Sequence, residues 1–270
     1  MEAQLVILGV LWLVAWRPYL TARRRLPASR SFEDVPWHGL DLILFALAFF
    51  AFHGTSALLI VGGDLPRVSR DSPWFLAADR LAQVIGTLAV LALVFVGRRI
   101  RPAHMGFGSR TVRTELVWAV SAYLLFLPVV LFSFQVSSWL LERLGQRVEP
   151  QELVRLFVER LRPGSGEETD AFLLPLFVFF TVILGPLCEE ILFRVILYSG
   201  FRRVLAPVPA VLLSSYIFAL FHTVSTLIPI FVLALLLGAL YERTRSLPAV
   251  FAVHALHNGI MVCGMLLLPV

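Results

Sequence analysis

The stretch PLCEEILFR, residues 186–194, decides how the rest of the chain is read, because it places two carboxylates and a guanidinium inside a long apolar segment. An ionisable side chain at bilayer depth is costly unless it is paired or faces a polar cavity. Glu189, Glu190 and Arg194 therefore indicate a functional site within a membrane-spanning helix. Polar residues in other apolar runs become candidates for the same site.

The composition is that of a membrane protein. Of the 270 residues, 59% are hydrophobic and 15% are charged, and the mean hydropathy is +0.84, whereas soluble domains carry about 25% charged residues. The net charge of +5 and the pI near 9.9 come from arginines in loops between apolar runs, a distribution typical of membrane orientation rather than of nucleic-acid binding. The basic residues are all arginine, which favours a bacterial source. We expect a multi-pass protein of the bacterial inner (cell) membrane.

Apolar runs long enough to cross a bilayer recur along the chain. About 30 Å of hydrocarbon requires roughly 20 helical residues. A short first run, Leu5–Trp16, is followed by longer runs at residues 37–61, 74–97, 115–140, 171–200, 207–225, 227–242 and 248–268. The sequence therefore predicts an all-α, polytopic transmembrane helical bundle of about eight spans. A cleaved signal peptide is the alternative for the first run.

Helical spacing separates the two glutamates. Glu190 and Arg194 are four residues apart, so on a helix they share a face and can form a charge-assisted pair. Glu189 is rotated by about 100° from its neighbour and has no obvious partner nearby in the sequence, which makes it the candidate general base. The alternative is a structural network in which both glutamates share the arginine. Pro186 removes a helical hydrogen bond just before the pair and is expected to open a polar pocket there.

Two later apolar runs carry histidines. His222 follows Phe218 by four residues, and His254 and Asn258 also lie one helical turn apart, with His257 on the same side. A lone intramembrane histidine is more often an interhelical hydrogen-bond partner than a catalyst. Depths counted from the cytoplasmic ends of the spans, at about 1.5 Å per residue, are compatible with one cavity. They are about 16, 22, 9 and 15 Å for Glu189, His222, His254 and Asn258.

These side chains fit a water-mediated acyl hydrolysis. A carboxylate and an imidazole can activate water, while a second imidazole and an amide can donate hydrogen bonds to an oxyanion. We expect no cofactor, but zinc is not excluded. Four acceptable zinc ligands are present: Glu189, His222, His254 and His257. The spacing, however, is not that of a His-Glu-x-x-His site, and Asn258 would be an unusual ligand.

Three motifs resemble those of the CPBP family of intramembrane proteases, which includes the type II CAAX prenyl endoproteases and the bacterial Abi-type proteins. The resemblance covers about residues 115–268 and rests on the order of the motifs on three apolar segments. The motifs are Glu189-Glu190-x-x-x-Arg194, Phe218-x-x-x-His222 and His254-x-x-x-Asn258.

The resemblance implies a division of roles and of the chain. Glu189 and His222 would activate the hydrolytic water, and His254 and Asn258 would stabilise the oxyanion. Residues 1–114 would form an N-terminal transmembrane region of about three spans. Residues 115–270 would form a CPBP-like intramembrane protease core.

The predicted function is therefore that of an intramembrane endopeptidase that uses a glutamate-activated water. Glu190 and Arg194 would be supporting residues, while His257 has no role in the family. Its partners would be a peptide or membrane-protein substrate and the lipid bilayer, with no nucleic acid; the oligomeric state is left open. The alternative is a non-catalytic transporter, scaffold or immunity protein that uses the buried Glu and His residues for binding.

Overall fold

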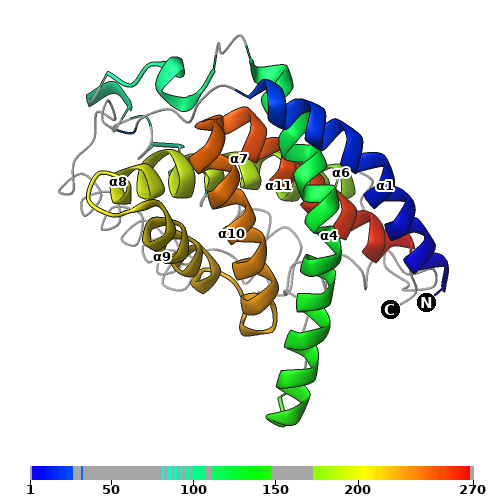
Figure 1. Cartoon of the computed structure of the whole chain (residues 1–270). Helices are drawn as coiled ribbons and strands as arrows, with labels where there is room; N and C mark the ends of the chain where they lie inside the picture. The colour runs from blue at the N-terminus through cyan, green and yellow to red at the C-terminus, as the bar shows by residue number, and fades with distance from the viewer. Residues whose placement is uncertain are drawn as a thin grey trace, which may run out of the picture. The chain divides into compact units, whose positions relative to one another are not determined.

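The chain folds into helices. The computed structural model describes residues 2–26, 32, 99–107, 111–146 and 173–267, together with isolated positions between residues 81 and 97. Every regular element in these residues is a helix (Figure 1). The prediction of an all-α fold is confirmed for this part of the chain. The runs predicted at residues 37–61 and 74–97 lie wholly or largely outside the described residues.

The helices are of three kinds: α-helices, short 3-10 helices and two wide-turn π-helices. The α-helices are α1 (Glu2–Arg25), α4 (Val112–Arg143), α6 (Leu173–Val178), α7 (Gly185–Glu190), α8 (Ser199–Phe201), α9 (Pro207–Leu220), α10 (Leu227–Thr244) and α11 (Leu247–Leu267). The 3-10 helices are η1 (Pro102–Met105) and η4 (Val224–Thr226), and the π-helices are η2 (Phe179–Leu184) and η3 (Ile191–Tyr198).

Four helices in the described part of the chain are long and apolar enough to cross a membrane. They are Val112–Arg143, Leu174–Phe201, Val224–Thr244 and Leu247–Met265. The apolar helix α9 is shorter, with 14 residues. Helix α1 extends well beyond the predicted first run but is not one of the four. The helical membrane bundle is thus confirmed, whereas the number of eight spans stays a prediction.

The chain forms two compact units that are interleaved in the sequence. The first contains Met1–Val35, Arg101–Glu149 and Glu190–His254, and the second contains Pro36–Ile100, Pro150–Glu189 and Ala255–Val270. The helix that runs from α6 to α8 and the helix α11 each contribute residues to both units. The division at residues 114 and 115 that the family resemblance implies stays a prediction.

In the first unit, α10 packs against both α4 and α9, and α1 lies along α4 (Figure 1). Apolar faces of these helices form the core, because their most buried side chains are large hydrophobic residues. Fully buried examples are Tyr123, Val130, Phe218, Leu233 and Leu237.

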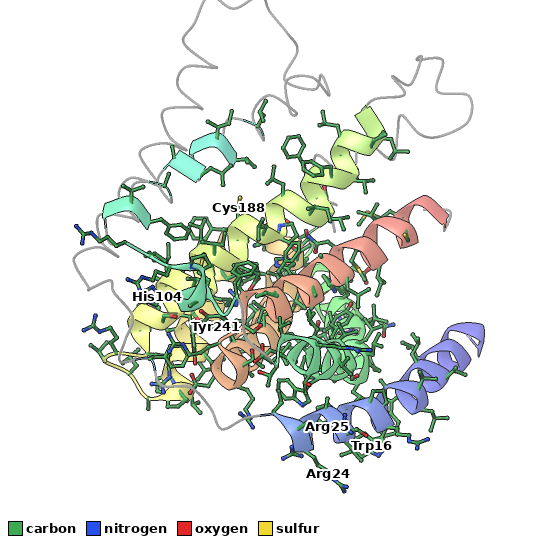
Figure 2. The ribbon with its side chains drawn as sticks, turned by 90° about the horizontal axis from the view of Figure 1, so that it is seen from above. Trp16, Arg24, Arg25, His104, Cys188 and Tyr241 are labelled. Carbon is green, nitrogen blue, oxygen red and sulfur yellow. The ribbon has the colours of Figure 1, made fainter. Side chains whose placement is uncertain are left out.

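Aromatic rings join α1 to α4. Trp12 and Trp16 stack with ring centroids 5.4 Å apart, Tyr19 stacks on Trp16 at 6.2 Å, and Trp118 of α4 stacks on Tyr19 at 6.1 Å. Figure 2 shows Trp16 on the same helix as the basic end that carries Arg24 and Arg25. Trp and Tyr near a cluster of arginines are typical of a helix end at a membrane–water interface.

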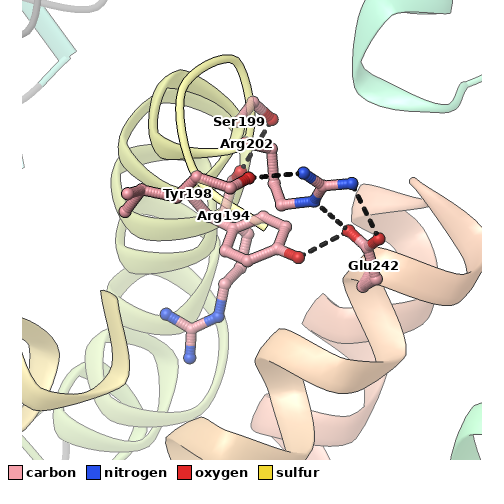
Figure 3. Close-up of polar contacts among 6 residues, drawn as sticks. Arg194, Tyr198, Ser199, Arg202 and Glu242 are labelled. Atoms are coloured by element: carbon pink, nitrogen blue, oxygen red, sulfur yellow. Dashed lines mark hydrogen bonds and ion pairs between the residues drawn. The ribbon is translucent and has the colours of Figure 1, made fainter. Parts of the chain in front are cut away.

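A polar network fixes the end of the helix that begins with α6. The Tyr198 hydroxyl donates to Glu242 Oε2 of α10 at 2.5 Å, and Arg202 Nε donates to the same oxygen at 2.9 Å (Figure 3). The hydrogen bond to Glu242 raises the pKa of Arg202 above its ordinary value. Phe32 extends this cluster. The guanidinium carbons of Arg202 and Arg245 lie 5.3 and 4.7 Å from the centroid of its ring, which are cation–π distances.

The second unit is described mainly by two helical segments. Phe177 and Val262 are buried against each other, and Val178 and Val182 pack on them. This contact brings α6 and η2 against the C-terminal half of α11.

Gly106 closes the turn after η1 against the segment that follows α10. Its φ angle is +82°, in the left-handed region that disfavours side chains with a Cβ. A Cβ at this position would lie 2.2 Å from the carbonyl oxygen of Arg245 and 2.7 Å from Cα of Ser246. Both the backbone angle and the backbone contact therefore require glycine.

We expect Gly106→Ala to lower the free energy of unfolding more than Gly145→Ala does. Gly145 also has a positive φ, +70°, but has nothing within 4 Å of an added Cβ, so alanine there costs only the backbone strain of about 1 kcal/mol. Gly106→Ala adds the overlap with Arg245. Thermal unfolding of the two variants in detergent measures the difference, and equal destabilisation would contradict the contact.

Candidate active site

The acidic pair lies in an α-helical segment between two wide-turn segments. Helix α7 carries Glu189 and Glu190 and is flanked by the π-helices η2 and η3. Wide turns are rare and recur at functional sites, because the extra residue re-aims side chains and backbone groups. Pro186 does not end the helix. The chain instead adopts the π-helical register just before it.

Glu190 is the centre of a buried ionic cluster in the first unit. Its Oε2 lies 3.3 Å from Nε of Arg194, and its Oε1 lies 2.8 Å from Nδ1 of His254. Glu190 and Arg194 are completely buried and His254 is 3% exposed. The pair expected from the i, i+4 spacing is therefore present, and the same carboxylate also binds the third motif.

Phe218 packs against three members of the polar motifs. The Arg194 guanidinium carbon lies 4.8 Å from the centre of the Phe218 ring, a cation–π distance. The rings of His222 and His254 lie 4.9 and 5.9 Å from the same centre, and Phe193 meets it edge-on at 4.9 Å. The phenylalanine of the second motif thus fixes the relative positions of Arg194 and both histidines.

His222 lies in the turn after α9, where one ring nitrogen is bonded to the end of the helix. Its Nδ1 is 3.1 Å from the carbonyl oxygen of Phe218. A carbonyl oxygen only accepts, so Nδ1 carries the proton in this bond. In the neutral ring, Nε2 then has a lone pair that can accept a proton or a hydrogen bond from water.

One hydrogen bond anchors the turn that follows His222. The Ser137 hydroxyl of α4 donates to the carbonyl oxygen of Ser225 at 2.8 Å, although the two residues are 88 positions apart. Within the turn, the hydroxyls of Thr223, Ser225 and Thr226 lie 3.0–3.1 Å from one another in two pairs. The position of the turn therefore depends on α4 as well as on its own side chains.

Asn258 is held in the second unit. Its Nδ2 donates to the carbonyl oxygen of Thr181, in η2, at 2.8 Å. The amide nitrogen carries two hydrogens, so a second one remains to donate elsewhere. Glu189 and His257 also belong to this unit, and His257 is 2% exposed.

The predicted site residues fall into both units. In the first unit the structure brings Arg194, His222 and His254 together around Phe218 and bonds Glu190 to Arg194 and His254. Glu189 and Asn258 lie in the second unit. Two contributors had not been predicted: Ser137 and Thr181. Ser137 acts through its hydroxyl and Thr181 through its backbone carbonyl. A serine within an apolar run does not indicate whether it bonds its own helix or another segment, and a backbone contact leaves no mark in the residue type.

Metal ligands do not gather in the part of the chain described. No three His, Cys, Asp or Glu side chains among these residues lie close enough together to hold a metal ion. The four ligands considered for zinc are divided between the units. The zinc alternative consequently stays a question for experiment.

Comparison with known proteins gives two similarities. Residues 171–260 match the family described as Rce1-like, type II CAAX prenyl endopeptidase. The membrane-embedded CAAX protease MroQ of Staphylococcus aureus (strain USA300) is 26% identical over 196 residues, which cover 69% of this chain and 73% of MroQ. These similarities support the CPBP/CAAX protease family. No solved structure matches the chain significantly.

The family match includes all three motifs, since Glu189 and Asn258 both lie within residues 171–260. The resemblance predicted from those motifs is thus confirmed. The two similarities and the four apolar helices also support an intramembrane protease that is integral to the membrane.

We expect Glu190→Gln to lower the free energy of unfolding by about 3 kcal/mol, because removing one charge of a buried pair leaves the other uncompensated. The double variant Glu190→Gln/Arg194→Met should recover part of the loss. Glu142→Gln is the matched control, since Glu142 is exposed at the end of α4. Thermal unfolding in detergent measures all three, and a Glu190→Gln variant as stable as the control would contradict the cluster.

Ser137→Ala should loosen the turn after His222, whereas Ser133→Ala should not. Both serines are buried on α4, but Ser133 donates to Val130 of its own helix. Losing the bond to Ser225 is worth about 1 kcal/mol, which corresponds to about fivefold faster amide exchange if the turn opens locally. Hydrogen exchange of residues 223–226 measures this, and equal exchange in the two variants would contradict the anchor.

Proposed function

We propose that this protein is an intramembrane endopeptidase in which Glu189 and His222 activate water and His254 and Asn258 stabilise the oxyanion. The observation that carries the proposal is the bond from His254 to the buried Glu190 carboxylate, which links the first and third motifs directly. Similarity to a CAAX protease and to the type II CAAX prenyl endopeptidase family supports the same reaction class.

Water is activated by a carboxylate and an imidazole. We assign the general base to Glu189, as the family resemblance implies, while Glu190 holds Arg194 and His254. His222 orients the water through Nε2, and the bond from its Nδ1 to Phe218 supports that tautomer. Glu189 takes a proton from the water as the water oxygen attacks the scissile carbonyl carbon, and it returns that proton to the amine nitrogen when the C–N bond breaks.

Two donors face the oxyanion of the tetrahedral intermediate. The Glu190 carboxylate, bonded to Nδ1, holds the His254 ring in one orientation, and Nε2 of that ring is the first proposed donor. The second hydrogen on Asn258 Nδ2 is the other donor. Each donor is held by a bond made before substrate arrives, which avoids reorganisation during the reaction.

The substrate is a peptide bond presented at or within the bilayer of the bacterial inner membrane. The similarity to a bacterial membrane-embedded protease supports this location. The proposed mechanism uses no metal. Water, base and oxyanion donors all come from the chain or the solvent.

We expect Glu189→Gln to abolish cleavage and Asn258→Ala to lower kcat about 100-fold, the typical cost of one oxyanion donor. The purified protein is offered a peptide library in detergent, and products are read by mass spectrometry. Glu142→Gln is again the matched carboxylate control and should cleave like the native protein.

Three outcomes would overturn the proposal. Equal cleavage by the native protein and Glu189→Gln would exclude Glu189 as the base. No cleavage by the native protein of any peptide, in detergent or in vesicles, would favour a transporter or scaffold. Cleavage that is lost on chelation and restored by zinc would replace the water activation proposed here by a metal-dependent one.

A further inference from the structure

A carbonyl oxygen is released from the helix at η2. The Gly185 N–H donates to the carbonyl of Phe180, five residues earlier, in the π-helical pattern. The same pattern would assign the carbonyl of Thr181 to the N–H of residue 186. Residue 186 is a proline, which has no N–H.

The vacated acceptor is taken by a side chain of another helix. Asn258 Nδ2 donates to Thr181 O at 2.8 Å. Helix-breaking prolines are tolerated in membrane spans when neighbouring groups satisfy the backbone atoms that they release. Here that neighbouring group is a residue of the third motif.

Glycine before the proline permits this geometry. A Cβ at Gly185 would lie 2.9 Å from the carbonyl oxygen of Phe180, a distance that side chains essentially never adopt. Alanine would therefore disturb the wide turn in which Thr181 lies. Gly185 and Pro186 act together, the first by allowing the π-helical turn and the second by withholding the N–H donor.

We propose that Pro186 is a positioning residue for Asn258. By withholding a backbone donor from Thr181 O, it leaves that oxygen to hold the Asn258 amide in one orientation. The second hydrogen on Nδ2 is then aimed in a fixed direction. This inference rests on the proposed function, in which that hydrogen binds the oxyanion.

The alternative is that Pro186 only shapes the helix. The two roles predict different results for Pro186→Ala. A role in helix shape alone predicts a less stable protein and a loss of kcat that is the same with or without Asn258. Alanine favours helix far more than proline does and restores an N–H that competes for Thr181 O. A positioning role thus predicts a protein that is no less stable and yet less active.

The experiment is a double-mutant cycle on kcat. We expect Pro186→Ala to lower kcat about tenfold in the native background, because the donor is misdirected rather than removed, with KM changed less than twofold. In the Asn258→Ala background the same substitution should change kcat less than twofold. The midpoint of thermal unfolding should not fall.

Pro128→Ala is the matched control, since Pro128 also lies inside a helix long and apolar enough to span a membrane, α4, and belongs to none of the three motifs. It should leave kcat within about twofold of the native value. A tenfold loss in both backgrounds, or a lower unfolding midpoint for Pro186→Ala, would overturn the positioning role.

A readout that does not need activity separates this inference from the proposed function. In ¹⁵N-labelled protein, the side-chain amide of Asn258 should exchange with solvent faster in Pro186→Ala than in the native protein. Faster exchange without any peptidase activity would retain the geometry and reject the proposed function. Unchanged exchange would reject the geometry itself.

Discussion

The buried carboxylate of Glu190, between Arg194 and His254, is the interaction on which the first unit depends. Three ionisable groups with almost no exposure are stable together only if every partner is in place, because an uncompensated charge in an apolar interior is costly. This requirement fixes the register of the helix that carries the first motif relative to the start of α11. Phe218 adds the end of α9 to the same cluster through its contacts with Arg194, His222 and His254.

The helix from α6 to α8 shows how an apolar span can present polar groups. Its two wide-turn segments flank α7 and its acidic pair. Wide turns change which backbone and side-chain groups point outward without ending the helix. In η2 the released Thr181 carbonyl binds Asn258. Tyr198, the last residue of η3, and Arg202, which follows α8, bind Glu242 through their side chains. The first contact belongs to the second unit, and the second fixes the helix end within the first unit.

Local spacing and long-range pairing differ in how far the sequence predicts them. The Glu190–Arg194 pair follows from an i, i+4 spacing on any helix, and hydropathy alone predicts a helical membrane protein. The bond from Glu190 to His254 spans 64 residues and depends on how two helices pack, which no local pattern contains. The roles of Thr181 and Ser137 depend on a wide turn and on a hairpin turn. Thr181 acts through its backbone carbonyl, which its residue type does not reveal, and a serine such as Ser137 in an apolar run does not by itself indicate its partner.

The three polar residues of the second and third motifs share one design: each uses one polar atom for a bond to the scaffold. His222 bonds the Phe218 carbonyl, Asn258 bonds the Thr181 carbonyl and His254 bonds the Glu190 carboxylate. In an apolar surrounding, such a bond both satisfies a polar atom and fixes its direction. Two of these anchors are backbone carbonyls, which do not titrate. The anchor of His254 is instead a carboxylate side chain. The same Glu190 carboxylate therefore holds His254 in place and compensates the charge of Arg194.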